Sequence, residues 1–231
     1  MILGVLQARM SSTRLPGKVM KPLLGEPMIA RQIERLRRAE RIDRLVVATS
    51  DHTSDDPLAA ALREAGVDVH RGPLDDVLAR YAGAVRAFGP AHHVVRLTAD
   101  CPLADWRVID ACIEFHLDGG FDYTANDLQR TFPHGLDVEV MTTAALGIAA
   151  REASTAEERE HVTPFLYRRP ERFKLGSLTQ AKDQSAERWT VDTPADFEFV
   201  KRVYERLYPS NAAFTTEDVM ALEFRHTAVD A

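Results

Sequence analysis

Apolar and polar positions alternate in a regular way along the first half of the chain. An apolar run predicts a strand at Ile2–Gln7, and after a loop to about Pro27 the spacing of Ile29, Ile33 and Leu36 predicts an amphipathic helix. Strands are then expected at 45–49, 67–70, 93–97 and 121–124, with helices at 57–65, 74–88 and 105–117 between them. Such β-α-β-α alternation indicates an α/β fold with a mostly parallel sheet and helices on both faces.

This alternation breaks at Asn126–Gly135, a polar segment that contains Pro133. Beyond it the pattern predicts strands at 136–141, 172–178 and 188–191, and helices at 143–152, 156–168, 194–207 and about 216–223. We expect residues 126–186 to form a smaller α+β excursion from the sheet, within a single domain that spans 1–231.

Composition and length favour one globular domain. The chain has 231 residues, of which 45% are hydrophobic and 28% charged. Its apolar runs are far shorter than the roughly 18 residues of a membrane span, and the first residues form a strand rather than a signal peptide, so we expect a cytoplasmic protein with no membrane partner. Cys101 and Cys112 lack metal-ligand spacing and are predicted to be packing residues.

The net charge of −6 is unevenly distributed. Residues 1–50 hold ten Lys/Arg against four Asp/Glu, whereas residues 51–231 hold 19 against 31. A basic end on an acidic body argues against nucleic-acid binding and permits a local anion site. Six arginines are predicted to form a solvated helix face: Arg31, Arg35, Arg37, Arg38, Arg41 and Arg44.

The loop after the first strand carries the strongest chemical signal. Its sequence, QARMSSTRLPGK at 7–18, offers three cations (Arg9, Arg14, Lys18), three hydroxyls and a glycine. Open parallel sheets bind ligands beyond the carboxyl ends of their strands, which is where this loop begins. Arginine forks, a lysine point charge and backbone N–H groups of a tight turn suit a polyphosphate. The spacing is neither that of a Walker loop nor Gly-x-Gly-x-x-Gly.

The same string resembles the amino-terminal signature of the cytidylyltransferases that make CMP-activated sugar acids, a family that includes the CMP-Kdo and CMP-sialic acid synthetases. It is most similar to the spore-coat polysaccharide biosynthesis branch. Further similar motifs follow over about residues 1–208: VVATSDHTSDDP at 46–57, RGPLDDVLARY at 71–81, RLTADCPL at 96–103, RTFPHGLDVEV at 130–140, EREHVTPF at 158–165 and RWTVDTPADFEFV at 188–200.

The resemblance implies a Rossmann-like fold of the nucleotide-diphospho-sugar-transferase type, transfer of CMP from CTP to an acidic acceptor, and release of pyrophosphate. By matching position, Arg9, Arg14 and Lys18 would hold the triphosphate, with Arg14 and Lys18 also catalytic. The loops at Thr49-Ser50-Asp51 and Arg71-Gly72 would face the base and ribose. Nucleotide binding is expected to involve Gln7, Ala8, Arg9, Ser12, Thr13, Arg14, Lys18, Thr49, Ser50, Asp51, Arg71, Gly72 and Thr98.

The resemblance also implies a magnesium ion held by Asp100 and Asp192, both counted as catalytic. Each is expected to follow directly on a strand, so both should emerge at the edge that carries the Arg9 loop. The alternative for either residue is a helix cap. Asp196 belongs to a predicted capping box with Thr193, whereas Asp192 lies outside it. Asp75 and Asp76 are predicted to suit the first turn of a helix that starts at Pro73.

The acceptor is expected to meet the polar residues of the excursion. The candidates are Asn126, Arg130, His134, Asp137, Glu139, Glu160 and His161. A sugar-acid carboxylate would use arginine or histidine, while glutamate could orient hydroxyls. For Glu160 and His161 a buried polar network or a subunit contact is an equal alternative, and the family suggests a homodimer through 126–186.

Two rival functions remain open from the sequence. A glycosyltransferase of related fold would carry Asp-x-Asp after a mid-sheet strand, where this chain has Asp100-Cys101-Pro102. A non-catalytic nucleotide-binding protein would lack at least one phosphate cation or metal carboxylate, and all five are present. The prediction is therefore a magnesium-dependent cytidylyltransferase whose acceptor the sequence does not identify.

Overall fold

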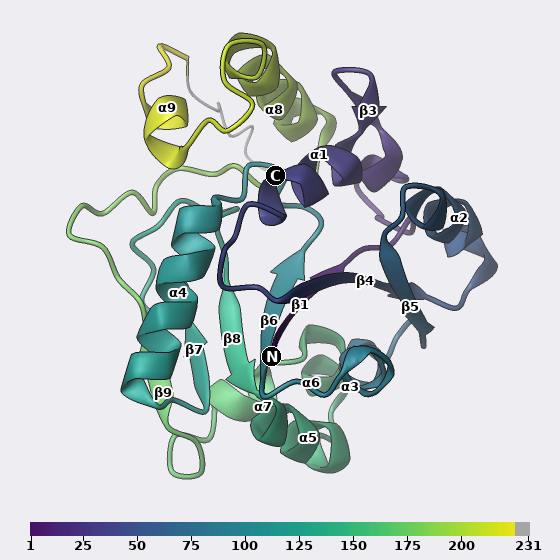
Figure 1. Cartoon of the computed structure of the whole chain (residues 1–231), viewed down its shortest axis with the longest axis vertical. Helices are drawn as coiled ribbons and strands as arrows, with labels where there is room; N and C mark the ends of the chain where they lie inside the picture. Colours follow the sequence, from purple (N-terminus) through teal and green to yellow (C-terminus); the bar gives the residue numbers. More distant parts are fainter. Residues whose placement is uncertain (225–231) are drawn as a thin grey trace.

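A seven-stranded sheet forms the centre of the computed structural model, which describes residues 1–224 (Figure 1). Its strand order is β5-β4-β1-β6-β8-β7-β9. The strands are β1 (Ile2–Gln7), β4 (Arg44–Ser50), β5 (Asp68–Gly72), β6 (His93–Thr98), β7 (Tyr123–Ala125), β8 (Glu139–Thr142) and β9 (Leu175–Ser177).

The strands β5, β4, β1 and β6 run parallel, β8 runs antiparallel to both β6 and β7, and β7 pairs in parallel with β9. The predicted α/β class with a mostly parallel sheet is confirmed. A small hairpin, β2 (Pro22–Leu23) with β3 (Glu26–Pro27), lies apart from this sheet.

Helices cover both faces of the sheet. One apolar core joins β1, β4 and β6 to α3 (Val77–Phe88), α5 (Thr143–Glu152) and α7 (Pro164–Tyr167). The opposite core joins the other faces of these strands to α1 (Met28–Leu36), α2 (Asp56–Glu64) and α4 (Trp106–Gly119). Successive residues of β6 show the division, because Val94 packs in the first core and Val95 in the second.

A third core closes the carboxyl edge of the sheet. It packs α8 (Pro194–Leu207) and α9 (Thr216–Met220) against the loop that follows β1 and against Trp189. Figure 1 shows β6 pointing toward α8 and α9. Arg35, predicted to be solvated, is buried here because its guanidinium donates to the carbonyls of Ala104 (2.9 Å) and Phe214 (3.0 Å).

Segment 126–186 is less of an excursion than predicted. It contributes β8 and β9 to the sheet, together with α5, α6 (Ala156–His161) and α7. The prediction of a single helix at 156–168 is wrong. The helix breaks between α6 and α7, because Val162 has a φ of 71° and Pro164 cannot continue the hydrogen-bond ladder.

Two further sequence predictions are corrected. Residues 188–191 do not form a strand: Arg188 makes only an isolated bridge to His134, and the amide of Val191 donates to the Asp100 carbonyl at 2.8 Å. The helix expected from residue 74 begins at Val77, because the Asp76 carboxylate caps it by accepting from the Ala79 amide at 2.9 Å. Within residues 1–224 no helix has the length and apolar character needed to cross a membrane.

Candidate active site

A cavity of about 370 Å³ lies where β1 and β6 end, at the carboxyl edge of the parallel strands. Its walls combine the loop after β1, the end of β6, the segment before α8 and the end of α6. The lining residues are Gln7, Ala8, Arg9, Ser12, Thr13, Arg14, Lys18, Val19, Arg96, Thr98, Ala99, Asp100, His161 and Asp192.

The loop after β1 is folded back on itself by local hydrogen bonds. Gly17 has a φ of 69° and donates its amide to the Met10 carbonyl at 2.9 Å, a turn that glycine makes without steric cost. The Met10 amide in turn donates to Asp55 at 2.7 Å. These bonds close the loop, so that Lys18 at the start of a 3₁₀ turn (Lys18–Met20) lies beside the cavity.

Asp192 is held by three cations rather than exposed as a bare carboxylate. Its Oδ1 lies 3.1 Å from both Arg14 Nη2 and Lys18 Nζ, and its Oδ2 lies 2.8 Å from Arg188 Nη2. The Asp192 amide donates to Asp196 at 2.8 Å, beside the capping box that Asp196 forms with Thr193 as predicted. Arg14 is exposed and Lys18 is largely buried, so the two cations differ in their solvation.

Asp100 reaches the same cavity from β6. Its Oδ1 accepts from the Thr98 hydroxyl at 2.5 Å and from the Cys101 thiol at 3.4 Å. Burial and the neighbouring Asp100 charge raise the pKa of Cys101, which keeps this thiol protonated as a donor. The hydrogen bond between Val191 and the Asp100 carbonyl brings the two predicted metal ligands together, although Asp192 follows a loop and not a strand.

Arg96 is a cavity residue that the sequence reasoning missed. It is the one arginine or lysine of strand β6, between the apolar Val95 and Leu97, and it lies two residues before Thr98 on the same face. The Arg96 guanidinium is paired with Glu139, which also accepts from the Tyr123 hydroxyl at 2.8 Å. A cation amid apolar strand residues was the signal that could have identified it.

The predicted base and ribose loops lie outside this cavity. Thr49 and Ser50 are fully buried. The Thr49 hydroxyl and the Ser50 amide each donate to the Asp55 carboxylate at 3.0 Å. Burial raises the pKa of Asp55, but the hydrogen bonds from Ser50, Met10 and Thr49 outweigh it and leave the pKa below its ordinary value. The two hydroxyls therefore have a partner already, and nucleotide binding by Thr49 and Ser50 stays a prediction.

The neighbouring Arg71 is similarly engaged. Its guanidinium donates to the carbonyls of Ser50 (2.8 Å) and His52 (2.9 Å) and pairs with Asp56 at 2.7 Å. The Asp51 amide donates to the Gly72 carbonyl at 2.8 Å. These bonds tie the ends of β4 and β5 together. Asp51, Arg71 and Gly72 do not line the cavity, and their contact with the base and ribose stays a prediction.

Of the predicted acceptor residues, only His161 lines the cavity. Asn126 is buried and uses both ends of its amide on backbone, donating to Leu136 O at 2.8 Å and accepting from Val138 N at 2.9 Å. The remaining residues lie outside the cavity lining: Arg130 pairs with Asp137 (2.5 Å), Glu139 is the partner of Arg96, His134 makes the isolated bridge to Arg188, and Glu160 is exposed on α6.

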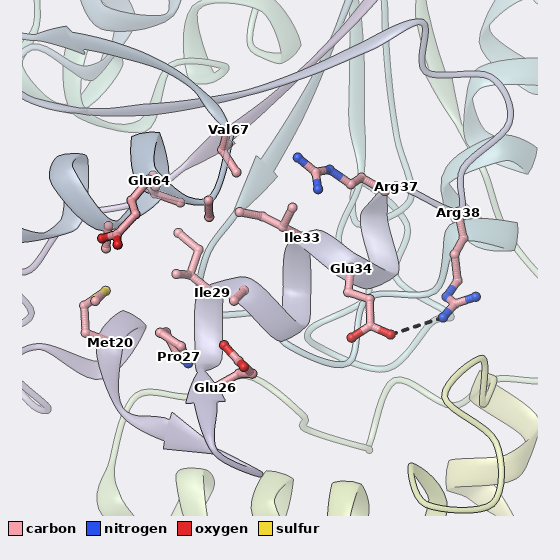
Figure 2. A pocket seen from close by; sticks show the side chains of 14 residues that line it. Met20, Glu26, Pro27, Ile29, Ile33, Glu34, Arg37, Arg38, Glu64 and Val67 are labelled. Atoms are coloured by element: carbon pink, nitrogen blue, oxygen red, sulfur yellow. Dashed lines mark hydrogen bonds and ion pairs between the residues drawn. The ribbon is translucent and has the colours of Figure 1, made fainter.

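Another cavity, of about 600 Å³, lies between α1 and α2 (Figure 2). Figure 2 shows Ile29, Ile33 and Val67 directed into it, with the Glu34 carboxylate paired to Arg38 at its margin. An apolar groove with three carboxylates and two guanidinium groups in its lining does not suit a triphosphate, and none of the predicted site residues lines it.

Comparison with known proteins gives concordant results along the chain. The family profile described as cytidylyltransferase matches residues 3–218. The spore coat polysaccharide biosynthesis protein SpsF of Bacillus subtilis is 34% identical over 212 residues, which cover 89% of this chain and 87% of that protein.

Solved structures agree with this match. A cytidylyltransferase from Leptospira borgpetersenii superposes with a TM-score of 0.88 at 32% identity, covering 95% of this chain and 92% of that one. A CMP:2-keto-3-deoxy-manno-octonic acid synthetase solved in complex with CTP has a TM-score of 0.67 at 18% identity, with 89% and 98% coverage. The second similarity concerns the fold alone.

Proposed function

The chain is an enzyme of the cytidylyltransferase family, and from this premise we propose that it transfers CMP from CTP to an acidic acceptor with release of pyrophosphate. The observation that carries the proposal is one cavity lined by both the phosphate cations and the two carboxylates. We propose surface polysaccharide biosynthesis as the setting, since SpsF is a spore coat polysaccharide biosynthesis protein.

Magnesium fits the two carboxylates, and Asp100 and Asp192 would hold it. Both line the cavity and offer hard oxygen donors. Two protein carboxylates suit magnesium, because it retains waters and takes phosphate oxygens as further ligands. When bound, the ion would neutralise triphosphate charge and polarise the α-phosphate.

The chain's own residues would supply binding and charge neutralisation. Arg14 and Lys18 pair with Asp192 in the structure and would transfer part of this pairing to the triphosphate, which carries more charge. The acceptor oxygen would form its bond to the α-phosphorus as the bond to the β-phosphate oxygen breaks. Positioning and electrostatic stabilisation account for most of the rate in such displacements.

Family membership argues against the rival functions. A glycosyltransferase would consume a nucleotide sugar and release a nucleotide, whereas the family acts on CTP. A non-catalytic relative would lack part of the set Arg9, Arg14, Lys18, Asp100 and Asp192, and all five line the cavity.

The test is pyrophosphate release with each of the four common nucleoside triphosphates, combined with a panel of sugar acids, sugar phosphates and phosphonates. We expect release with CTP and an acidic acceptor only, and a product mass that equals acceptor plus CMP. Release of a free nucleotide from a nucleotide sugar would instead identify a glycosyltransferase. Absence of any turnover with intact CTP binding would identify a binding protein.

The oligomeric state completes the proposal. We infer a homodimer through residues 126–186, on the strength of the resemblance alone. Light scattering at micromolar concentration should give twice the chain mass of 25.8 kDa, and a mass of one chain would contradict the dimer.

A further inference from the structure

Arg96 lines the cavity from strand β6, whereas Arg9, Arg14 and Lys18 line it from the loop after β1. On its face of β6 the side chains are Val94, Arg96 and Thr98, of which Val94 is fully buried in the core. Arg96 is therefore the first position along this face whose side chain reaches the cavity, and 14% of that side chain is exposed. From β6 the cavity continues past Thr98 and Asp100 to the cations paired with Asp192.

The Arg96 guanidinium keeps donors that the protein does not use. Arginine carries five N–H donors, and the hydrogen bond of Arg96 within residues 1–224 runs from Nη1 to the Glu139 carboxylate. Its Nε is buried with no partner among these residues. A buried donor without an acceptor is costly. Arg96 Nη2 also makes no hydrogen bond within residues 1–224 and is not buried, so an oxyanion in the cavity can accept a charge-assisted hydrogen bond from it.

Glu139 and Tyr123 hold Arg96 in place and do not themselves line the cavity. Glu139 is 7% exposed, does not line the cavity, and accepts from both Arg96 and the Tyr123 hydroxyl. Its acceptor groups are thus occupied, while Arg96 has donors left over. A buried ion pair contributes little net stability compared with apolar residues of similar size, so stability alone gives a weak reason for this pair.

We propose that Arg96 binds an oxyanion of the acceptor, either a carboxylate or a phosphoryl group, and that Glu139 and Tyr123 are positioning residues for it. The inference rests on the proposed cytidylyl transfer and extends it by naming the acceptor-recognition group. The triphosphate would then occupy the end of the cavity with Arg14 and Lys18, and the acceptor the end with Arg96 and His161.

The test compares acceptor and nucleotide constants in matched variants. Arg96→Met leaves Glu139 buried and unpaired, so the double variant Arg96→Met/Glu139→Gln removes both charges and keeps the fold testable. Arg31→Met is the control: Arg31 is equally buried at 15% exposure and pairs with Glu34 at 3.3 Å, but it lies on α1 outside the cavity. The probes are 3-deoxy-manno-octulosonate, its methyl ester, and glycerol 3-phosphate.

Acceptor affinity is measured by calorimetry in the presence of an α,β-methylene CTP analogue, and KM by pyrophosphate release. We expect the double variant to raise acceptor Kd and KM at least about tenfold, as for loss of one charge-assisted contact, with KM for CTP changed less than about twofold. Loss of affinity for 3-deoxy-manno-octulosonate in the double variant would identify carboxylate recognition, and loss of affinity for glycerol 3-phosphate would identify phosphoryl recognition. A wild-type enzyme that binds the ester as well as the acid would exclude carboxylate recognition, and the proposal is overturned if the double variant also binds glycerol 3-phosphate as well as the wild type does.

The proposal is also overturned if the Arg96 variants match Arg31→Met in acceptor constants, or if the CTP and acceptor constants rise together. Both results leave cytidylyl transfer itself intact. In contrast, a wild-type protein that releases no pyrophosphate with any acidic acceptor overturns the proposed function and the role of Arg96 with it.

Discussion

The two ends of the cavity are built in different ways. At the phosphate end, the loop at 7–18 supplies Arg9, Arg14 and Lys18 from one continuous stretch of chain. At the proposed acceptor end, Arg96 comes from β6 and its partner Glu139 from β8, so the pair forms only after the sheet has formed, and His161 joins the lining from α6.

The ion pairs at the two ends also differ in solvation. Arg14 is 57% exposed where it meets Asp192, whereas Lys18 on the same carboxylate is 11% exposed, and the Arg96 and Glu139 side chains are 14% and 9% exposed. Exposed pairs are weak and exchange readily, while breaking a buried pair leaves an uncompensated charge. Arg14 is thus suited to exchange Asp192 for a ligand, whereas Lys18 and Arg96 are suited to keep a fixed geometry.

The largest effect is expected where the two ends meet, at the carboxylates. Asp100→Asn and Asp192→Asn should each lower pyrophosphate release by about 100- to 1000-fold, as for loss of a group that stabilises transition-state charge. Because the two would serve one ion, the double variant should be little worse than either single variant. The measurement is turnover against magnesium concentration.

The exposed Asp118→Asn on α4 is the matched control and should retain full turnover. Multiplicative losses in the double variant, with an unaltered magnesium dependence, would contradict a shared ion. Asp192→Asn should also weaken the pairing with Arg14, Lys18 and Arg188, so thermal unfolding is followed for every variant.

A smaller effect is expected within the phosphate end alone. Lys18→Ala should lower turnover with CTP by about 10- to 150-fold, because it removes one charge-assisted contact of roughly 1.5–3 kcal/mol. Lys201→Ala on α8 removes a solvated lysine and serves as the control. Unchanged turnover of Lys18→Ala would show that Lys18 serves only to pair with Asp192.

The phosphate end was largely predictable from the sequence, since its groups are local. A strand followed by a loop rich in cations, hydroxyls and glycine identifies the site before any tertiary contact is known. All seven residues predicted from the loop line the cavity: Gln7, Ala8, Arg9, Ser12, Thr13, Arg14 and Lys18. The same locality made the α/β class and the helices at 143–152 and 194–207 predictable.

The pair of Arg96 and Glu139 was not predicted because it depends on pairing across strands. Arg96 and Glu139 are opposite each other on antiparallel strands, a register that one sequence does not reveal. The extended pattern at 188–191 suggested a strand, but its amides donate to Asp100 and His134 instead of a neighbouring strand. The spacing of apolar residues over 156–168 likewise gave no sign that the helix breaks at Val162.

The acceptor end provides the next prediction. Glu139→Gln keeps the shape of the residue but removes the charge that orients Arg96, so acceptor KM should rise a few-fold while KM for CTP stays constant. Tyr123→Phe removes one hydrogen bond to the same carboxylate and should raise the acceptor KM by less than Glu139→Gln does. Glu152→Gln, which removes a solvated partner of Arg172, is the control.

The last prediction concerns stability behind the proposed acceptor end, where His116 is fully buried between α4 and β7. Its Nδ1 lies 3.0 Å from the Thr124 hydroxyl and its Nε2 lies 3.0 Å from His93 Nδ1. Burial, and then the neighbouring His93, lower the pKa of His116 to about 4. Burial also lowers the pKa of His93.

Both histidines therefore stay neutral in the folded protein at pH values where they would be charged in the unfolded chain. The contribution of His116 to stability is complete above the unfolded pKa of about 6.5 and is lost as the pH falls toward 4, since the unfolded state then binds more protons; His93 acts in the same direction. The free energy of unfolding should fall by up to about 1.4 kcal/mol per pH unit for His116 in this interval. Denaturant unfolding from pH 7.5 to 5 measures it, and His116→Gln should flatten the slope. Hydrogen exchange should locate the loss at β7 and spare the loop at 7–18; an equal loss at both ends would contradict the separation between them.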